Sequence, residues 1–198
     1  KASLKNIMRA LRLPFISASV IPYLFGSSIA RQNFNFWGFF LGLMAVCCAH
    51  LSGNLINDYA DSKSGADAQD VHFYGFFGGS KLIQENVFPA KFYLKAAVIF
   101  AGACSFCASL LSFALRSATP IWIYLVVIFL AWSYSASPLR LSYRRLGEAA
   151  VFILFGPVPV MGGYFIQTGV FPDMKSFVLS LPFGILTAAI LFANEVPD

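Results

Sequence analysis

Long uncharged stretches dominate the hydrophobic pattern of this chain. Crossing the core of a lipid bilayer, which is roughly 30 Å thick, takes about 20 residues of α-helix. Stretches of about this length without Asp, Glu, Lys or Arg occur six times: Leu13–Ala30, Gln32–Asn57, Ala96–Leu115, Ser117–Leu139, Ala149–Pro172 and Ser176–Asn194. The pattern therefore predicts an all-α fold, a polytopic bundle of six transmembrane helices.

The overall composition supports the same class of protein. Hydrophobic residues make up 58% of the 198 residues and charged residues only 12%, against about 45–50% and about 25% in soluble domains. The net charge of +5 would suggest nucleic acid in a soluble protein. Here the basic residues lie between apolar stretches, where they set membrane topology or bind phosphate. We expect an integral membrane protein that contacts the lipid bilayer and has no nucleic-acid partner.

The charged residues fall mainly on one side of the predicted bundle. With the N-terminus in the cytoplasm, eleven of the fourteen Lys and Arg residues lie in cytoplasmic segments, as do eight of the nine Asp and Glu residues. Cytoplasmic loops are rich in Lys and Arg, so this orientation is the favoured one. We expect a bacterial inner or plasma membrane, with the polar face toward the cytoplasm.

Proline and glycine positions predict local features of the helices. Pro22, Pro157, Pro159 and Pro182 lie within predicted spans, where proline kinks a helix. Gly38 and Gly42, four residues apart, would allow close contact with a neighbouring helix. A short amphipathic helix is expected near residues 90–95.

The strongest chemical signal is the end of the second span, NLINDYADSKSGAD. Asn54, Asn57, Asp58 and Asp61 have the spacing of one helix face, and Asp67 follows in the loop. Carboxylates clustered at a membrane edge repel one another and are costly to desolvate. Mg²⁺ prefers oxygen ligands and commonly bridges carboxylates to substrate phosphates. We predict a Mg²⁺ site of Asn57, Asp58, Asp61 and Asp67; the alternative is an ordinary solvated helix end.

The last span ends in a second polar group, and cationic residues lie between the two. Asn194 and Asp198 would emerge on the same face of the membrane and could hold a second metal ion, although an ordinary helix end is also open. Four residues are candidates for binding a substrate diphosphate: Asn54, Lys81, Arg140 and Arg144. Topology alone would also place the three basic residues on this side.

Four segments of the chain carry a resemblance to a known family. The pattern from Asn57 to Asp67, NDYxDxxxGxD, resembles the first Asp-rich motif of the UbiA superfamily of intramembrane prenyltransferases. The segments GGSKLIQENV, YSASPLRLSYRRLGE and the terminal NEVPD resemble further family segments in the same order. The Gly65-x-Asp67 spacing looks most like the branch that prenylates 1,4-dihydroxy-2-naphthoate in menaquinone synthesis.

The resemblance implies a fold and an activity. It predicts one membrane-embedded prenyltransferase domain over residues 1–198, incomplete at the C-terminus, with six helices of an expected nine. The expected reaction transfers a polyprenyl group from its diphosphate to an aromatic acceptor, with Mg²⁺ as cofactor. Asp61, Lys81 and Arg140 would assist departure of the diphosphate, and Tyr134 would stabilise the allylic cation through its ring.

Other functions stay open at this point. A different acceptor is possible within the family: 4-hydroxybenzoate, homogentisate, haem or a glycerol phosphate lipid. A cation channel or carrier would use the Asp cluster as its binding site, although the predicted spans hold no acidic residue at mid-membrane. An assembly subunit that keeps only the fold is the third alternative. The sequence identifies neither the acceptor pocket, nor the prenyl length, nor the oligomeric state.

Overall fold

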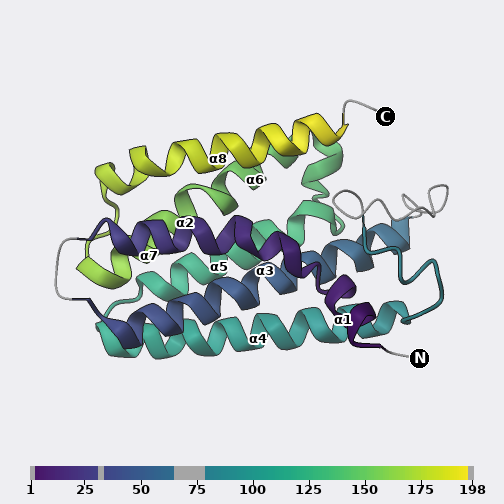
Figure 1. The fold of residues 1–198 in the computed structure, drawn as a ribbon, viewed down its shortest axis with the longest axis horizontal. Helices are drawn as coiled ribbons and strands as arrows, with labels where there is room; N and C mark the ends of the chain where they lie inside the picture. Colours follow the sequence, from purple (N-terminus) through teal and green to yellow (C-terminus); the bar gives the residue numbers. More distant parts are fainter. Residues whose placement is uncertain (1–2, 31–33, 65–78, 196–198) are drawn as a thin grey trace.

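The protein folds as a bundle of helices packed side by side (Figure 1). The computed structural model describes residues 3–30, 34–64 and 79–195, with side chains through Ala193, and these residues contain no strand. The elements in chain order are α1 (Leu4–Ala10), η1 (Leu13–Ile16), α2 (Ser17–Ser28), α3 (Phe36–Ser64), α4 (Ala90–Leu115), α5 (Thr119–Ser135), η2 (Leu141–Arg144), α6 (Gly147–Phe155), α7 (Pro157–Thr168) and α8 (Met174–Glu195). The prediction of an all-α bundle is confirmed.

Each of the six predicted spans is helical, but not all of them meet the length of a membrane crossing. Four do so by length and composition: α3, α4, α6 with α7, and α8. A fifth results if α1 and the helix Leu13–Ser28 are one span, bent by 45°. Helix α5 is apolar but has only 17 residues. The protein is therefore an integral membrane helical bundle, and its described residues form four or five long spans and one shorter apolar helix.

The fifth predicted span is divided where proline predicts a break. Helix α6 ends at Phe155, and α7 begins at Pro157, which stands at the first helical position and needs no hydrogen-bond acceptor for a backbone N–H. Pro22 and Pro182 lie inside α2 and α8, which continue through them. The short helix expected near residues 90–95 is instead the first part of α4.

Glycines allow the close contacts among α2, α3 and α7. A Cβ atom on Gly26 would lie 2.0 Å from the carbonyl oxygen of Val160 in α7. At Gly42 a Cβ would lie 2.3 Å from the hydroxyl oxygen of Tyr23, and this hydroxyl donates to the carbonyl of Phe39 at 2.6 Å. The close helix contact predicted from Gly38 and Gly42 is confirmed, with α2 and α7 as the partners of α3.

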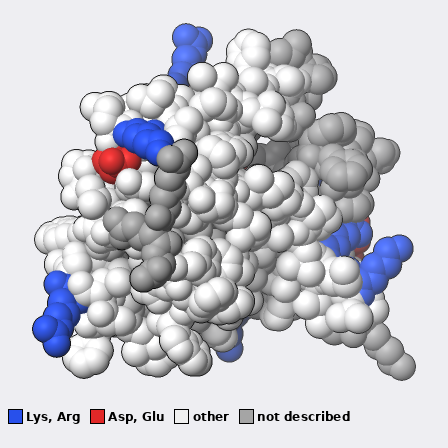
Figure 2. Space-filling view, turned by 60° about the vertical axis from the view of Figure 1, so that its left-hand side comes forward, with Lys and Arg blue, Asp and Glu red and all other residues white. Residues whose placement is uncertain are grey.

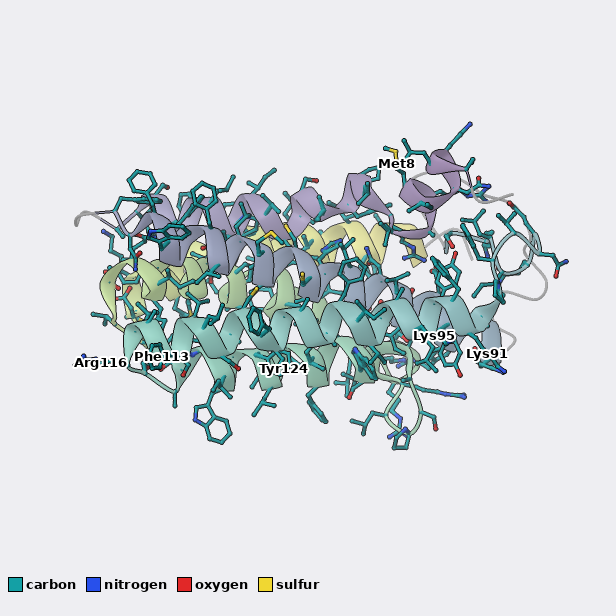
Figure 3. The ribbon with its side chains drawn as sticks, turned by 90° about the horizontal axis from the view of Figure 1, so that it is seen from below. Met8, Lys91, Lys95, Phe113, Arg116 and Tyr124 are labelled. Carbon is teal, nitrogen blue, oxygen red and sulfur yellow. The ribbon has the colours of Figure 1, made fainter. Side chains whose placement is uncertain are left out.

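The two ends of the bundle differ in what they carry. Both chain termini lie at one end, where the C-terminal part of α3 and the start of α4 also lie (Figure 1). Lys91 and Lys95 lie at this end together with Met8, whereas Arg116 lies at the opposite end (Figure 3). This arrangement follows the division of basic segments that the sequence predicts.

Much of the outer surface is apolar. Large side chains are well exposed, including Trp37 at 83% and Phe113 at 86% of their surface. Figure 2 shows a face covered almost entirely by uncharged side chains, with a few separated Lys, Arg and acidic residues. Such a surface is unfavourable in water and suits a hydrocarbon environment.

Candidate functional site

A cavity of about 670 Å³ runs through the interior of the bundle. Along α3 its wall extends from Gly42 to Asn57, which is about 22 Å at the rise of an α-helix. Most wall residues are apolar and come from α2 and from α3 to α8, among them Leu111, Val127 and Leu154. The result is a long apolar chamber inside a membrane protein.

One group of polar wall residues lies toward the C-terminal end of α3. Asn54 and Asn57 of α3 and Tyr134 of α5 line the cavity there, together with Arg12 at the start of η1. The side-chain amide of Asn57 donates a hydrogen bond to the hydroxyl of Ser135, which fixes the amide against α5. Three residues predicted from sequence thus share one cavity: Asn54, Asn57 and Tyr134.

Asp61 connects the end of α3 to the basic loop after α5. Its Oδ1 atom accepts a hydrogen bond from the hydroxyl of Tyr143, 3.3 Å away in η2. Arg140 immediately precedes η2 and Arg144 is its last residue; both are exposed. The guanidinium of Arg144 also donates to the carbonyl of Pro138 at 3.1 Å. The structure therefore brings the predicted acidic helix end next to the predicted cationic loop.

Asp58 has protein partners that the sequence pattern did not predict. It is only 3% exposed, forms an ion pair with Arg12, and accepts a hydrogen bond from the backbone N–H of Ser80 at 3.1 Å. The hydroxyl group of Ser80 in turn bonds that of Tyr93 at 2.6 Å. Both carboxylate oxygens of Asp58 thus have protein partners, and its side chain joins α3 to the N-terminal segment.

Lys81 follows Ser80, the residue whose backbone N–H donates to Asp58. Its side chain is 4% exposed, and it is not part of the cavity wall. Its backbone adopts φ of 57°, in the left-handed region, directly after the Ser80 amide that Asp58 holds. The predicted role of Lys81 in binding a diphosphate stays a prediction.

For the second predicted metal group, Asn194 and Asp198, the structure describes only the helix that leads to it, α8. Asp67 and Asp198 lie outside the described residues, as does the side chain of Asn194. Ile190 and Leu191, one turn before Asn194, line the same cavity as Asn54 and Asn57. Helix α8 also ends at the end of the bundle where α3 ends (Figure 1). The helices that carry the two Asn/Asp groups therefore share a cavity and an end.

The donor set at the end of α3 is chemically suited to a hard cation. Asn57 and Asp61, four residues apart on one helix, offer an amide oxygen and a carboxylate, and Mg²⁺ commonly binds one or two carboxylates and completes its shell with water and phosphate. Within the part of the chain that the structure describes, no three His, Cys, Asp or Glu residues group as a metal site. Of the predicted acidic ligands, Asp58 forms an ion pair with Arg12 instead.

The structure also adds residues that the sequence pattern did not single out. Arg12 reads as a topology signal in the sequence, yet it lines the cavity and holds Asp58. His50 has no evident partner in the sequence, whereas in the structure its Nδ1 atom lies 2.7 Å from the hydroxyl of Ser19. The partners come from α2 and η1, so no local spacing could reveal either pair.

Comparison with known proteins gives a family match over most of the chain. The sequence profile described as the UbiA prenyltransferase family matches residues 19–198. No solved structure shows a significant match.

Several curated proteins are similar along the whole chain at modest identity. The 2-carboxy-1,4-naphthoquinone phytyltransferase of Synechocystis is 29% identical over 98% of this chain and 61% of its own length. The 1,4-dihydroxy-2-naphthoate octaprenyltransferase of Bacillus subtilis is 28% identical over 100% of this chain and 62% of its own. A UbiA prenyltransferase domain-containing protein 1 homolog of Drosophila melanogaster is 28% identical, over 98% and 54%. The chain thus spans a little over half the length of these relatives.

Proposed function

The chain belongs to the UbiA prenyltransferase family, and on that premise we propose that it transfers a polyprenyl group from a polyprenyl diphosphate to an aromatic acceptor. The single observation that carries the proposal is the position of Asn57 and Asp61. Asn57 lines one end of a long apolar cavity, and Asp61, one helical turn further along α3, contacts the basic η2 region through Tyr143. A lipid diphosphate has the matching shape, with an apolar tail and a charged head.

The acceptor that we propose is 1,4-dihydroxy-2-naphthoate, as in menaquinone biosynthesis. Support comes from the names of two relatives, which specify a naphthoquinone or a naphthoate as the acceptor. The Gly65-x-Asp67 spacing within the first Asp-rich motif supports the same choice. The apolar wall near Tyr134 and Phe155 would accommodate a flat bicyclic ring.

The prenyl tail would lie in the cavity. A polyprenyl chain is stabilised by about 0.8 kcal/mol for each CH₂ group removed from water. The cavity extends about 22 Å along α3 from Asn57 to Gly42, and its far part is lined by apolar residues such as Leu111 and Ile166. The head group would stay at the polar end, beside Asn57.

The diphosphate would be bound by charge at the polar end. We propose that Asn57, Asp61 and Asp67 hold one Mg²⁺, with Asn194 and Asp198 contributing to a second, and we leave Asp58 out of this set because Arg12 and Ser80 engage it. Bound Mg²⁺ would supply neutralisation of the charge that develops on a departing diphosphate. Arg140 and Arg144, at the two ends of η2, would add cationic contacts to the same group.

Ionisation of the diphosphate leaves an allylic cation, which must be shielded from water. The apolar wall excludes water from the carbon that carries the positive charge. The Tyr134 ring lines the cavity, and an aromatic face stabilises a cation by about 0.5–2 kcal/mol. Tyr134 is held at the end of α5, where Ser142 donates to its carbonyl at 2.8 Å.

The proposed site would face the cytoplasm of a bacterial inner membrane. The positive-inside rule places the basic end of the bundle there. Lys91 and Lys95 lie at that end, and Arg116 lies at the other (Figure 3). A soluble aromatic acid and the diphosphate product could then exchange with the cytoplasm.

The experiment that tests the proposal is product analysis. Membranes containing the protein are supplied with Mg²⁺, a mixture of aromatic acceptors and a series of polyprenyl diphosphates, and the lipid extract is examined by mass spectrometry. We expect a prenylated naphthalene product that disappears with EDTA. Prenylation of a different acceptor would overturn the choice of 1,4-dihydroxy-2-naphthoate and retain the transferase function. Release of diphosphate without any prenylated ring would refute the transferase function.

A further inference from the structure

His50 carries a buried polar atom without a hydrogen-bond partner, in a residue that lines the cavity. Its side chain is 8% exposed and lines the cavity wall in the middle of α3. Its Nδ1 atom lies 2.7 Å from the hydroxyl oxygen of Ser19 in α2, whereas its Nε2 atom is buried without a hydrogen-bond partner. Buried polar atoms nearly always have a partner in folded proteins. A ligand group in the cavity is a natural partner for Nε2.

Asn54 presents a second unused atom on the same side of α3. It follows His50 by four residues, lines the same cavity, and its amide nitrogen Nδ2 is buried without a partner. Residues four apart on a helix lie one above the other, about 6 Å apart. The two orphaned atoms therefore belong to neighbouring side chains in one wall.

Ser19 and Phe155 hold the imidazole in place between them. Ser19 contacts one ring nitrogen, and the ring of Phe155 meets the imidazole edge to face, with 5.7 Å between centroids and 86° between planes. The bond at one ring nitrogen decides whether the other donates or accepts. When Nδ1 donates to Ser19, Nε2 is an acceptor that has no partner among the described residues.

A ring hydroxyl matches this pair in chemistry. Its O–H can donate to the Nε2 atom of His50, while its oxygen accepts from the Nδ2 atom of Asn54. Such a group satisfies both buried atoms at once, and the apolar wall around them suits the body of an aromatic ring. Asn54 lies about 4.5 Å along the helix axis from Asn57, one turn below the proposed metal site.

We propose that His50 and Asn54 bind a hydroxyl group of the aromatic acceptor, with Ser19 as the residue that positions His50. The assignment rests on the proposed function and deepens it, because it gives the acceptor its own site in the cavity. It also moves Asn54 from the diphosphate, as predicted from sequence, to the acceptor. The ring would then lie between this pair and the charged end of the cavity.

The test uses two probes that differ only in the hydroxyl group: 1-naphthol and 1-methoxynaphthalene. Their binding to the protein in lipid nanodiscs is measured by equilibrium dialysis without prenyl diphosphate, and partition into protein-free nanodiscs is subtracted. We expect wild-type protein to bind 1-naphthol about tenfold more tightly, since an unmatched buried hydrogen-bonding group is costly. A ratio near one in the wild type would overturn the proposal.

Variants test whether His50 and Asn54 cause the difference in affinity between 1-naphthol and 1-methoxynaphthalene. His50→Phe and Asn54→Leu should each bring the ratio close to one, whereas His50→Gln, which keeps a polar group near the position of Nε2, should retain part of it. Val127→Ala alters an apolar part of the same wall. It should lower the affinity for both probes equally and leave the ratio unchanged. An unchanged ratio in folded His50→Phe or Asn54→Leu protein would refute the assignment. Thermal unfolding in nanodiscs establishes which variants fold. If His50→Phe does not fold, the binding ratio of His50→Gln is used to test the role of His50.

Transfer activity is measured separately, so that the two ideas can fail independently. In the transferase assay, His50→Phe should raise the KM for the aromatic acceptor about tenfold and leave the KM for the prenyl diphosphate unchanged. Equal effects on both values would count against an acceptor site. A His50-dependent binding ratio in a protein that prenylates nothing would refute the proposed function and retain the hydroxyl site.

Discussion

The hydroxyl of Tyr143 donates a hydrogen bond to the carboxylate of Asp61, 3.3 Å away. This contact joins the end of α3 to η2, two segments that are 82 residues apart in the chain. It places an acidic residue of the first Asp-rich motif beside the loop that carries Arg140 and Arg144. The proposed chemistry depends on this meeting of opposite charges one helical turn beyond Asn57, which lines the cavity.

Asp61→Asn should reduce Mg²⁺-dependent release of diphosphate by about 10²–10³-fold, the loss expected for an electrostatic group at a reaction centre. The substitution keeps the size of the side chain and removes its charge. Diphosphate release is measured on full-length protein in membranes. Asp173→Asn is the matched control: Asp173 accepts from the backbone N–H of Ser176 at the start of α8, and asparagine caps a helix equally well. Activity within a few-fold of wild type in Asp61→Asn would exclude the metal role.

Asp58→Ala should act on stability rather than on the affinity for Mg²⁺. Removing the carboxylate leaves the half-buried guanidinium of Arg12 without its ion-pair partner, which costs up to about 3 kcal/mol of unfolding free energy, the lower end for a fully buried pair. Thermal unfolding in detergent measures the loss.

The double variant Arg12→Met with Asp58→Leu provides the control for that prediction. It removes both charges together, so it should be less destabilised than Asp58→Ala. If Asp58→Ala instead keeps its melting temperature and requires much more Mg²⁺ for activity, Asp58 returns to the set of metal ligands.

Arg140→Ala should raise the KM for the prenyl diphosphate about tenfold, because it removes a charge-assisted contact to phosphate. Steady-state kinetics with varied prenyl diphosphate measures the change. Arg116→Ala removes the same side chain at the opposite end of the bundle (Figure 3) and should leave the KM unchanged. Equal behaviour of the two variants would remove Arg140 from the diphosphate site.

Gly26→Ala should destabilise the bundle by about 1–3 kcal/mol, the usual effect of an extra methyl group in a closely packed interior. A Cβ at this position would lie 2.0 Å from the Val160 carbonyl oxygen, so α2 and α7 would have to separate. Gly102→Ala in α4 is the control, because a Cβ there meets nothing within 4 Å and alanine favours helix. Melting temperatures of the two variants in detergent give the comparison; a stable Gly26→Ala protein would contradict the close α2–α7 contact.

The helices and the membrane class followed from the sequence alone. Bilayer thickness sets the length of an apolar helix, so uncharged stretches of about 20 residues mark the spans without any tertiary information. Helical spacing likewise predicted that Asn54 and Asn57 lie together, and both line the cavity. The break before Pro157 was also readable, since proline lacks the N–H that a continuing helix requires.

The tertiary structure decided which neighbour each polar side chain meets. Asp58 was predicted to lie on the same helix face as Asn57 and Asp61, but its carboxylate pairs with Arg12, 46 residues earlier. His50 lies within an apolar stretch, and only the packing of α2 brings Ser19, 31 residues away, to its Nδ1 atom and leaves its Nε2 atom buried without a partner. Helical periodicity determines the face on which a residue lies, whereas the partner that covers that face depends on contacts between segments distant in the chain.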